Sequence, residues 1–286
     1  MSKKEVKIVE CPRDAMQGIK AFIPTQKKID YLNLLLKVGF HTLDFGSFVS
    51  PKAIPQLKDT AEVLSKLDLE STKTELLAIV ANERGANDAA QFDEIDLLGY
   101  PFSISETFQK RNTNASIGES KGRLEEIQNI ADKVGKQLVV YLSMGFGNPY
   151  GDPYHEDLLA EYLNDLSQLD IKIFALSDTI GAANPELIRR VFSTVIPEFP
   201  NLEIGAHMHT TPDSWEEKVA AAFESGCKRF DGAIAGYGGC PMAADDLTGN
   251  MPTEKLIQYF DKQEISLVDN ELLQEAQKMA ASVFPL

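Results

Sequence analysis

Two histidines separated by one residue are the strongest chemical signal in the sequence. His207 and His209 flank Met208 at the end of an apolar run that is typical of a buried strand. Because alternate residues of a strand face the same side, both imidazoles can reach one ion. Two hydrogen-bonded structural histidines would give the same spacing. Acidic residues at the ends of other predicted strands favour a metal site.

Further polar side chains stand where other predicted strands end. Arg13 and Asp14 follow the first strand, Asp44 ends the second, and Asp178 follows the sixth. The loop Gly238-Gly239-Cys240-Pro241 follows the eighth. In a barrel of parallel strands, the residues at the carboxyl ends of the strands form the active site. We therefore predict that these side chains converge with the two histidines.

The kinds of ligand indicate the kind of ion. Two imidazoles with a carboxylate and an amide oxygen make a mixed nitrogen and oxygen set, which suits octahedral Mg²⁺ or Mn²⁺ with open water positions. A structural zinc site would contain more sulfur. The facial triad of Fe(II) enzymes uses similar ligands, so ligand type alone leaves iron open.

Each of the other candidates also has a structural interpretation. The glycines and the proline around Cys240 would allow its loop to present a thiol, but a single cysteine is more often a buried small hydrophobe, as suits Cys227. Asp178 can instead cap a helix. Arg13 can be an ordinary ion-pair arginine, although its place beside Asp14 at a strand exit favours binding of an anion or a carbonyl group.

The elements that must position these residues alternate along the chain. Short β-branched or apolar runs are followed by amphipathic stretches, which predicts βα units and a parallel sheet. The eight strand candidates are Val6–Glu10, His41–Phe45, Glu75–Val80, Glu94–Leu98, Gln137–Leu142, Lys172–Ser177, Leu202–His207 and Arg229–Ala233. Eight units in 286 residues predict a (β/α)₈ TIM barrel, an α/β fold, as a single domain over residues 1–286 with its active site at the carboxyl ends of the strands.

Capping signals place several of the helices. The first long helix is expected from Thr25, as its N-cap, to Gly39, where it stops. Further helix starts are expected at Asn184-Pro185, Thr211-Pro212-Asp213 and Pro252-Thr253-Glu254. The alternative fold is an open doubly wound sheet, but the turn Cys11-Pro12-Arg13-Asp14 lacks the glycines of a phosphate cradle.

The acidic composition limits the partners of the protein. The sequence holds 28 Lys plus Arg against 43 Asp plus Glu, a net charge of −15, and this field repels nucleic acid and anionic membrane surfaces. An anionic substrate would need a local basic pocket. The odd count of three cysteines, with no targeting segment and no run of about 18 apolar residues, predicts a cytoplasmic protein without a membrane span.

Seven segments spread over nearly the whole chain carry a resemblance to a known family. They are Val6–Gln17 (VKIVECPRDAMQ), Ser47–Gln56 (SFVSPKAIPQ), Ser105–Ser120 (SETFQKRNTNASIGES), Ser177–Gly181 (SDTIG), His207–His209 (HMH), Gly236–Pro241 (GYGGCP) and Gly249-Asn250. In them the sequence resembles the 3-hydroxy-3-methylglutaryl-CoA (HMG-CoA) lyases, which belong to a superfamily of metal-dependent lyase and synthase barrels. The Arg-Asp pair and the H-x-H motif are common to the superfamily, whereas SFVSPK, GGCP and the later Gly-Asn are specific to the lyases.

The resemblance implies a carbon–carbon lyase that cleaves (S)-HMG-CoA to acetyl-CoA and acetoacetate by a retro-Claisen reaction. It also implies that Arg13 binds the thioester oxygen and that Cys240 is the acid/base on a mobile loop. His207 or Asp178 would take the hydroxyl proton. The implied ligands of a Mg²⁺ or Mn²⁺ ion are Asp14, His207, His209 and Asn250.

Further expectations from the resemblance concern the substrate and the assembly. The implied substrate-binding residues are Gln17, Asp44, Ser47 and Asn112. Lys110, Arg111 and Asn112 are weaker candidates for contacts to the acyl chain or to the phosphates of CoA, since a solvated surface run explains them equally well. A homodimer and a place in leucine degradation are also implied.

The sequence departs from the family pattern at several positions. Ala15 replaces the glycine of an Arg-Asp-Gly run, and Asp44 stands where glutamate is usual. Thr210–Asp213 replaces an Asp-Thr-Tyr-Gly-like run, and the chain from Cys240 to Asn250 is one residue longer. These changes leave the ligand chemistry intact and bear on the acyl-group preference.

Two other functions are compatible with the same residues. The nearest is an acyl-CoA condensing synthase or aldolase of the same superfamily, which would share the metal cradle. A non-catalytic metal-binding barrel is an alternative of another class. A metallohydrolase is disfavoured, because hydrolase barrels of this kind place H-x-H on the first strand, whereas this sequence places it on the seventh.

Overall fold

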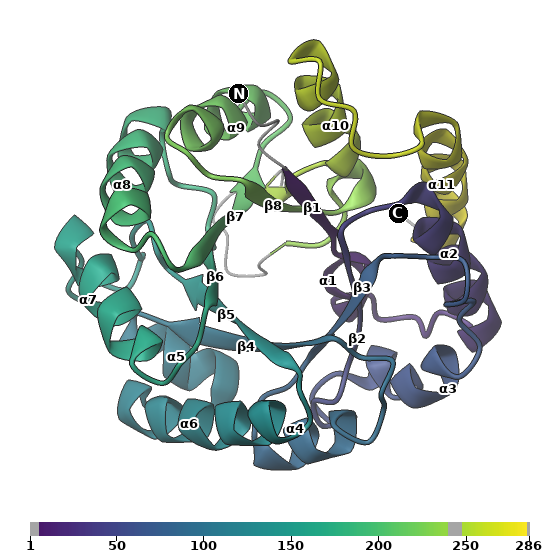
Figure 1. The fold of residues 1–286 in the computed structure, drawn as a ribbon, viewed down its shortest axis with the longest axis horizontal. Coiled ribbons are helices and arrows are strands. Elements are labelled where there is room, and N and C mark those ends of the chain that lie inside the picture. The colour runs from purple at the N-terminus through teal and green to yellow at the C-terminus, as the bar shows by residue number, and fades with distance from the viewer. Residues whose placement is uncertain (1–5, 240–247, 285–286) are drawn as a thin grey trace.

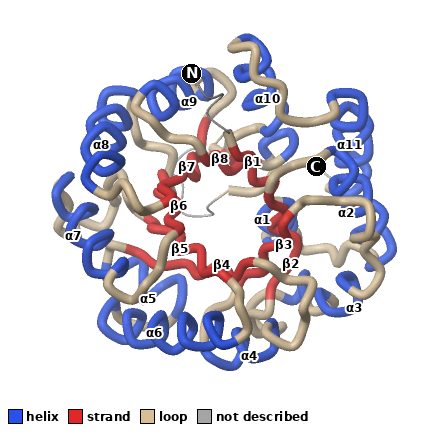
Figure 2. The backbone as a smooth tube through the Cα atoms, viewed as in Figure 1, coloured by secondary structure: helices blue, strands red, loops and turns tan. Residues whose placement is uncertain are grey.

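The computed structural model describes residues 6–239 and 248–284, and these residues form a (β/α)₈ barrel. Each strand from β1 to β6 pairs in parallel with the next, β1 also pairs with β8, and β8 pairs with β7. The pairing of β6 with β7 closes the ring. Figure 2 shows the strands as a central ring with the helices outside it. The predicted fold is confirmed.

The strands alternate with helices along the chain, which the colours of Figure 1 trace from the N-terminus to the C-terminus. The strands are β1 (Lys7–Glu10), β2 (Thr42–Ser47), β3 (Glu75–Ile79), β4 (Leu97–Ser103), β5 (Gln137–Ser143), β6 (Ile173–Asp178), β7 (Glu203–Thr210), β8 (Arg229–Gly232) and the short β9 (Gly249–Asn250). The helices are α1 (Pro12–Gln17), α2 (Thr25–Val38), α3 (Thr60–Leu64), α4 (Glu83–Ala89), α5 (Glu106–Thr113), α6 (Ile117–Lys133), α7 (Glu156–Ser167), α8 (Pro185–Glu198), α9 (Trp215–Glu224), α10 (Thr253–Lys262) and α11 (Asn270–Val283).

The strands bury both of their faces, as parallel strands covered by helices do. One face of each strand packs against the helices in a large outer core. The other face points into the barrel, where β3 to β6 contribute a small apolar cluster of Leu77, Ile79, Leu97, Val139, Tyr141, Ile173 and Ala175. This inner cluster forms the floor below the carboxyl ends of the strands.

The largest boundary error of the sequence analysis concerns β4, which was expected at Glu94–Leu98. The strand begins at Leu97 and continues to Ser103, through Gly99 and Pro101. Its pairing with β3 ends at Gly99, whereas its pairing with β5 continues to Ser103. Because β4 has only one neighbour beyond Gly99, a proline without an N–H group is tolerated there.

Helices α8 and α10 begin where the sequence predicts, and α9 begins later. Asn184 caps α8 by accepting a hydrogen bond from the Leu187 N–H, and α10 begins at Thr253, both as expected. Helix α9 begins at Trp215 rather than near Thr211, because Ser214 closes a turn by accepting a hydrogen bond from the Thr211 N–H.

The first helices also differ in detail from the prediction. Thr25 is the first helical residue of α2 and not its cap, since its hydroxyl donates to Asp59. Gly39 ends α2 with a φ of 88°, a left-handed conformation that glycine adopts readily. The predicted turn after β1 is the short helix α1, with Pro12 at its first position, where proline is favoured.

The last helix packs on the outside of the barrel. Helix α11 lies beside α2 in Figure 1, and the two helices are in contact. Among the described residues, no helix combines the length and the apolar character that a membrane span requires.

Candidate active site

Three of the four predicted metal ligands meet at the carboxyl ends of the strands. Asp14 comes from α1, directly after β1, and His207 and His209 come from β7. One ligand atom from each lies within 4.8 Å of the others. The strand β9 pairs antiparallel with β7 and places Asn250 opposite His209. All four predicted ligands therefore belong to one corner of the barrel mouth.

The ring of His209 is oriented to bind a cation through Nε2. Its Nδ1 donates a hydrogen bond to the Thr179 carbonyl oxygen over 2.7 Å, so the lone pair lies on Nε2. This Nε2 is buried and has no hydrogen-bond partner among the described residues. Burying a polar atom without a hydrogen-bond partner costs free energy, unless a ligand interacts with that atom. The geometry therefore fits a cation at this position.

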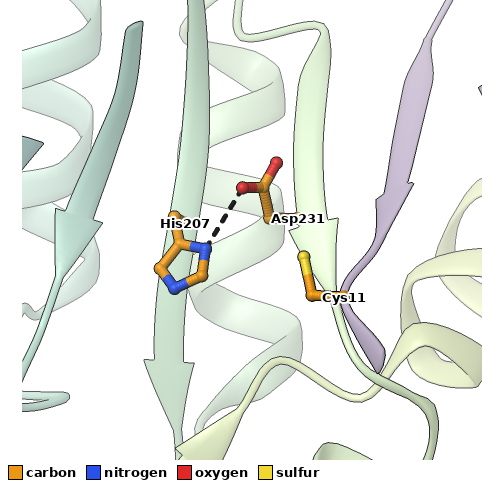
Figure 3. A group of neighbouring side chains, drawn as sticks. All are labelled: Cys11, His207 and Asp231. Atoms are coloured by element: carbon orange, nitrogen blue, oxygen red, sulfur yellow. Dashed lines mark hydrogen bonds and ion pairs between the residues drawn. The ribbon is translucent and has the colours of Figure 1, made fainter. Parts of the chain in front are cut away.

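The ring of His207 is held in a similar way. Its Nδ1 is 3.1 Å from the Asp231 carboxylate on the neighbouring strand β8, and Figure 3 shows Nε2 at the opposite side of the ring. Metal-binding histidines usually direct one nitrogen to the ion and the other to a carboxylate or carbonyl oxygen. Both histidines of the H-x-H motif have this arrangement.

Asp14 presents an ionised carboxylate to the two histidines. One oxygen accepts hydrogen bonds from Arg13 Nη1 at 3.0 Å and Gln17 Nε2 at 2.6 Å, and the other accepts from Asn250 Nδ2 at 2.7 Å. Burial acts to raise the pKa of Asp14, but the charges of Arg13 and His207 and the bond from Asn250 lower it below its ordinary value. The carboxylate is thus available as a ligand at neutral pH.

The two histidines titrate in opposite directions. Burial lowers the pKa of His209 below its ordinary value, and the charge of His207 adds to that effect. Burial also acts against protonation of His207, but the hydrogen bond and the charge of Asp231 raise its pKa. His209 is therefore the imidazole that is more readily neutral, which is the form that binds metals.

Asn250 reaches the site through a tight backbone arrangement. Its Nδ2 donates to the Asp14 carboxylate and, over 2.9 Å, to the Tyr237 carbonyl oxygen. Gly238 lies against it with a φ of 83°, and a Cβ there would come within 3.0 Å of the Asn250 side chain. The amide nitrogen faces Asp14 in this arrangement, so the role of Asn250 as an oxygen ligand stays a prediction.

Arg13 is fixed in place by two carboxylates. Its Nη2 is 2.6 Å from Asp44, its Nε is 3.0 Å from the same oxygen, and its Nη1 binds Asp14 and Gln17. Asp44 is fully buried below Arg13, and burial raises the pKa of Asp44 to about 6 even though Arg13 opposes that shift. Asp44 thus contacts Arg13 and is not among the residues that line the pocket.

A cavity of about 200 Å³ opens beside these residues. Its polar wall contains Arg13, Asp14, Gln17, His207 and His209, and its apolar wall contains Val49, Ile54, Ile79, Pro101 and Phe108. Asn112, another predicted substrate-binding residue, is exposed at the lining of the same cavity. The cavity combines one guanidinium group, candidate metal ligands and apolar surface, as small-molecule sites usually do.

The structure does not bring Asp178 and Ser47 to the cavity lining. The Asp178 carboxylate is buried toward α9, where it pairs with Lys218 over 2.7 Å and accepts from the Ala183 N–H. The reason is alternation: Ser177 and Thr179 line the cavity, so Asp178 between them faces the helices. Ser47, the last residue of β2, accepts a hydrogen bond from the Val49 N–H just after the strand. Cys240, the predicted acid/base, lies outside the described residues.

Two residues at the site were missed by the sequence analysis. Thr179 orients His209 through its carbonyl oxygen, and no side-chain pattern could have revealed a backbone contact. Asp231 orients His207, and here a signal existed, because Asp231 is a charged residue inside a predicted apolar strand. Such a residue must face a partner inside the barrel.

The fold and the site define a (β/α)₈-barrel protein with a candidate cation site of two imidazoles and a carboxylate at the carboxyl ends of its strands. The family model described as HMGL-like matches residues 5–280 of the chain. The chain belongs to this family, that of the hydroxymethylglutaryl-CoA lyases.

Individual relatives are similar over most of their length. A curated hydroxymethylglutaryl-CoA lyase of Bacillus subtilis is 34% identical over 263 residues, which cover 92% of this chain and 87% of the relative. The mitochondrial hydroxymethylglutaryl-CoA lyase of Bos taurus is 34% identical over 257 residues, covering 89% and 78%. The solved structure of an HMG-CoA lyase from Acinetobacter baumannii in complex with coenzyme A and 3-methylmalate aligns with a TM-score of 0.90 at 29% identity, covering 99% of this chain and 92% of that one.

Proposed function

We propose that this protein is an HMG-CoA lyase, which cleaves HMG-CoA to acetyl-CoA and acetoacetate. The observation that carries the proposal is the convergence of Asp14, His207 and His209 beside Arg13 in one cavity. Nε2 of His209 has no hydrogen-bond partner in the part of the chain that the structure describes. The curated relatives that are named for this reaction support it. The cavity volume of about 200 Å³ suits the acyl group rather than the whole of coenzyme A.

A divalent cation, Mg²⁺ or Mn²⁺, is the proposed cofactor. Asp14, His207, His209 and Asn250 would hold it. A bound cation of this kind lowers the pKa of a coordinated hydroxyl group and orients it. The donor set of two imidazole nitrogens and a carboxylate oxygen fits such an ion, with positions left for water and substrate.

The reaction requires that a proton leaves the C3 hydroxyl group of the substrate. The electron pair of the O–H bond then forms the ketone of acetoacetate, while the C2–C3 bond breaks and leaves the enolate of acetyl-CoA. Of the two proposed bases, His207 lines the cavity and Asp178 does not. Because Nδ1 of His207 is bound to Asp231, Nε2 has the one free lone pair of the ring. That lone pair can bind the cation or accept the proton, but not both at the same time.

Arg13 is placed to offset the negative charge of the enolate oxygen. Asp44 and Asp14 hold its guanidinium group at the cavity before the charge develops, so that little reorganisation is needed. Among the contacts of the described residues, one N–H of Nη2 remains for the substrate. Gln17 contacts Arg13 and Asp14 and would hold both side chains in position for the substrate. Asn112 would contact the substrate at the cavity edge.

Cys240 is proposed to protonate the enolate carbon, which completes acetyl-CoA. If so, Cys240→Ala lowers turnover by at least an order of magnitude and leaves the affinity for Mn²⁺ unchanged. The steady-state rate of acetoacetate formation and Mn²⁺ titration measure the two effects. The matched control is Cys227→Ala, since the Cys227 thiol is buried under β7 and β8 and burial raises its pKa to about 12. A Cys240→Ala variant with normal turnover would contradict the assignment.

The proposed function is tested directly with purified protein. We expect acetoacetate and acetyl-CoA from HMG-CoA in the presence of Mn²⁺ or Mg²⁺, and none after treatment with EDTA. Acetyl-CoA with a 2-oxo acid is the comparison, because a condensing synthase would join that pair. Condensation without cleavage of HMG-CoA, or binding of Mn²⁺ without any reaction, would refute the lyase proposal.

The setting of the reaction is part of the same proposal. We place the protein in the cytoplasm as a homodimer, with a role in leucine degradation, and acyl-CoA is its substrate partner. The complex of coenzyme A with the Acinetobacter baumannii relative supports an acyl-CoA ligand. Sedimentation of the purified protein tests the homodimer.

A further inference from the structure

Below the candidate cation site, the inside of β7 and β8 is lined by charged side chains. Asp231 lies beside His207 in the register of the two strands, and Arg229 is two residues before Asp231 on the same face of β8. Arg229 and Asp231 are 1% and 2% exposed. At the lower end, Arg229 Nη1 is 3.2 Å from Glu203, which also binds Lys7 at 2.6 Å. A series of charges thus runs from the bottom of the barrel to His207.

The neighbouring residues make room for this series. A Cβ at Gly205 on β7 would come within 3.1 Å of three atoms of the Arg229 stem, so the stem can lie there only because residue 205 is glycine. Gly205 and His207 are two residues apart and share the inner face of β7. The arginine is therefore built into the barrel directly below the histidine.

The charged groups act on one another. Burial works against the positive charge of Arg229, but the negative charges of Asp231 and Glu203 raise its pKa above the ordinary value. Oδ1 of Asp231 and Nε and Nη2 of Arg229 have no hydrogen-bond partner within the described part of the chain. Burying such groups is costly, and apolar residues of similar size would stabilise a barrel interior at least as well. Stability alone does not explain their presence.

The cysteine beside Asp231 does not compete for its carboxylate. Figure 3 shows Asp231 between the ring of His207 and the sulfur of Cys11, with an interaction drawn to His207. The Cys11 thiol donates to the Val9 carbonyl oxygen. Burial, with the charges of Asp231 and Asp44, raises the pKa of Cys11 well above its ordinary value. A neutral thiol turned toward Val9 leaves the Asp231 carboxylate to His207.

We propose that Asp231 is a positioning residue that fixes the ring orientation and the tautomer of His207 for cation binding. In this proposal the positive charge of Arg229, below Asp231 in the barrel, stabilises the negative charge of the Asp231 carboxylate. The inference rests on the proposed cation site. A carboxylate only accepts hydrogen bonds, so in the neutral ring of His207 Nδ1 carries the hydrogen and Nε2 carries the lone pair. Without Asp231 the ring is free to rotate and to place its hydrogen on Nε2, which then cannot bind an ion.

The test is the affinity for Mn²⁺ without substrate, measured by electron paramagnetic resonance on the full chain. Carboxylates of this kind typically contribute 10- to 100-fold to metal affinity. We expect that Asp231→Asn and Asp231→Ala each raise the Kd for Mn²⁺ by at least about 10-fold. Asp231→Asn keeps the shape of the side chain, but its amide can donate to Nδ1 and so favour the wrong tautomer, as an asparagine does in a catalytic triad.

The matched control is Asp59→Asn, which removes another buried carboxylate. Asp59 pairs with Lys28 between α2 and α3, away from the cation site. We expect Asp59→Asn to lower the unfolding temperature and to leave the Kd for Mn²⁺ within about twofold of the value of the parent protein. Arg229→Met should weaken Mn²⁺ binding in the same direction as the Asp231 variants, and an unchanged Kd in Arg229→Met overturns the supporting role of Arg229.

The outcomes separate this inference from the proposed function. A folded Asp231→Asn protein that binds Mn²⁺ within twofold of the parent overturns the positioning role while the cation site stands. If the Asp231→Ala protein does not fold, the Kd of the Asp231→Asn protein for Mn²⁺ alone tests the positioning role. A parent protein that binds no Mn²⁺ removes the cation site, and the positioning role with it.

Discussion

At the residue scale, the chemistry of the site depends on how each ionisable group is held. Arg13, Asp14 and Asp44 form one buried cluster in which each charge has a partner. The sequence predicts that Arg13 and Asp14 lie together, because they are adjacent at a strand exit. Asp44 was expected to bind the substrate, whereas in the structure the Asp44 carboxylate lies under Arg13. The difference arises because a list of polar strand ends does not show which side chains pair with each other.

The role of Arg13 is tested by replacing it with methionine. We expect Arg13→Met to lower kcat about 10²- to 10³-fold, as the loss of an oxyanion donor does. The same change leaves Asp44 buried without its cation, which costs about 3–5 kcal/mol of stability. Turnover of HMG-CoA and denaturant unfolding measure the two effects separately.

A double variant distinguishes catalysis from stability. Arg13→Met with Asp44→Asn removes both charges of the pair, so that most of the lost stability should return. Turnover should stay low, because the guanidinium group is still absent. Recovery of turnover together with stability would mean that Arg13 acts only through the fold.

At the element scale, the short strand β9 carries Asn250 to the site. Its pairing with the end of β7 depends on Gly249, since a Cβ there would overlap the carbonyl oxygen of Gly236. We expect Gly249→Ala to displace β9, to weaken Mn²⁺ binding and to lower turnover at least about 10-fold, because Asn250 contacts Asp14 from this strand. Gly122→Ala in α6 is the control, because a Cβ there meets no atom within 4 Å and alanine favours the helix by about 1 kcal/mol. Equal Mn²⁺ affinity in the two variants would rule out this role of β9.

Glu10 links β1 to the elements after β8 and should make stability depend on pH. Its carboxyl group accepts from the Ile234 N–H and bonds to the Thr253 hydroxyl, and burial raises its pKa from 4.5 to about 8. The folded protein therefore holds this proton at pH values where the unfolded chain has released it. The resulting stability is fully present below about pH 4.5 and is lost as the pH rises to about 8.

The pH dependence is tested with Glu10→Gln, since the glutamine mimics the protonated acid. The free energy of unfolding of the parent protein should fall between pH 5 and 8 relative to that of the variant, by about 1.4 kcal/mol for each unit of pKa difference that is traversed. Denaturant unfolding at several pH values measures the difference. Parallel curves for the two proteins would show that Glu10 ionises in the folded state as it does in water.

Element boundaries were harder to predict than element types. The alternation of apolar runs and amphipathic stretches was enough to predict eight strands in a closed barrel. It failed at β4, because Gly99 and Pro101 interrupt the pattern that marks a strand, and only tertiary pairing with β5 tolerates them. It could not reveal β9, since a two-residue strand has no periodicity to read.

At the scale of the whole molecule, the closed barrel brings two segments together that are far apart in the sequence. Asp14 follows the first strand and Asn250 follows the last strand of the barrel, and they are joined by a hydrogen bond because β1 and β8 are neighbours. The predicted fold and the residue types indicated that Asp14 would lie near the two histidines, whereas Asn250 was expected from the family resemblance alone. The orientation of each histidine ring is set by Thr179 and Asp231, and these contacts form only in the folded barrel.

A cation at this point should stabilise the whole barrel. Asp14 on α1 and the histidines on β7 lie far apart in the unfolded chain, so the folded state has the site and the unfolded state does not. Mn²⁺ at 100 times its Kd should then add about 2.7 kcal/mol to the free energy of unfolding, and EDTA should remove that increment. His209→Ala deletes the buried Nε2, which has no partner among the described residues, and should abolish the increment. The control is His155→Ala, because His155 lies just before α7, outside the cavity lining, and that variant should keep the full increment. Thermal and denaturant unfolding with and without Mn²⁺ measure the effect, and an equal increment in His209→Ala would show that Mn²⁺ stabilises the barrel from a different site.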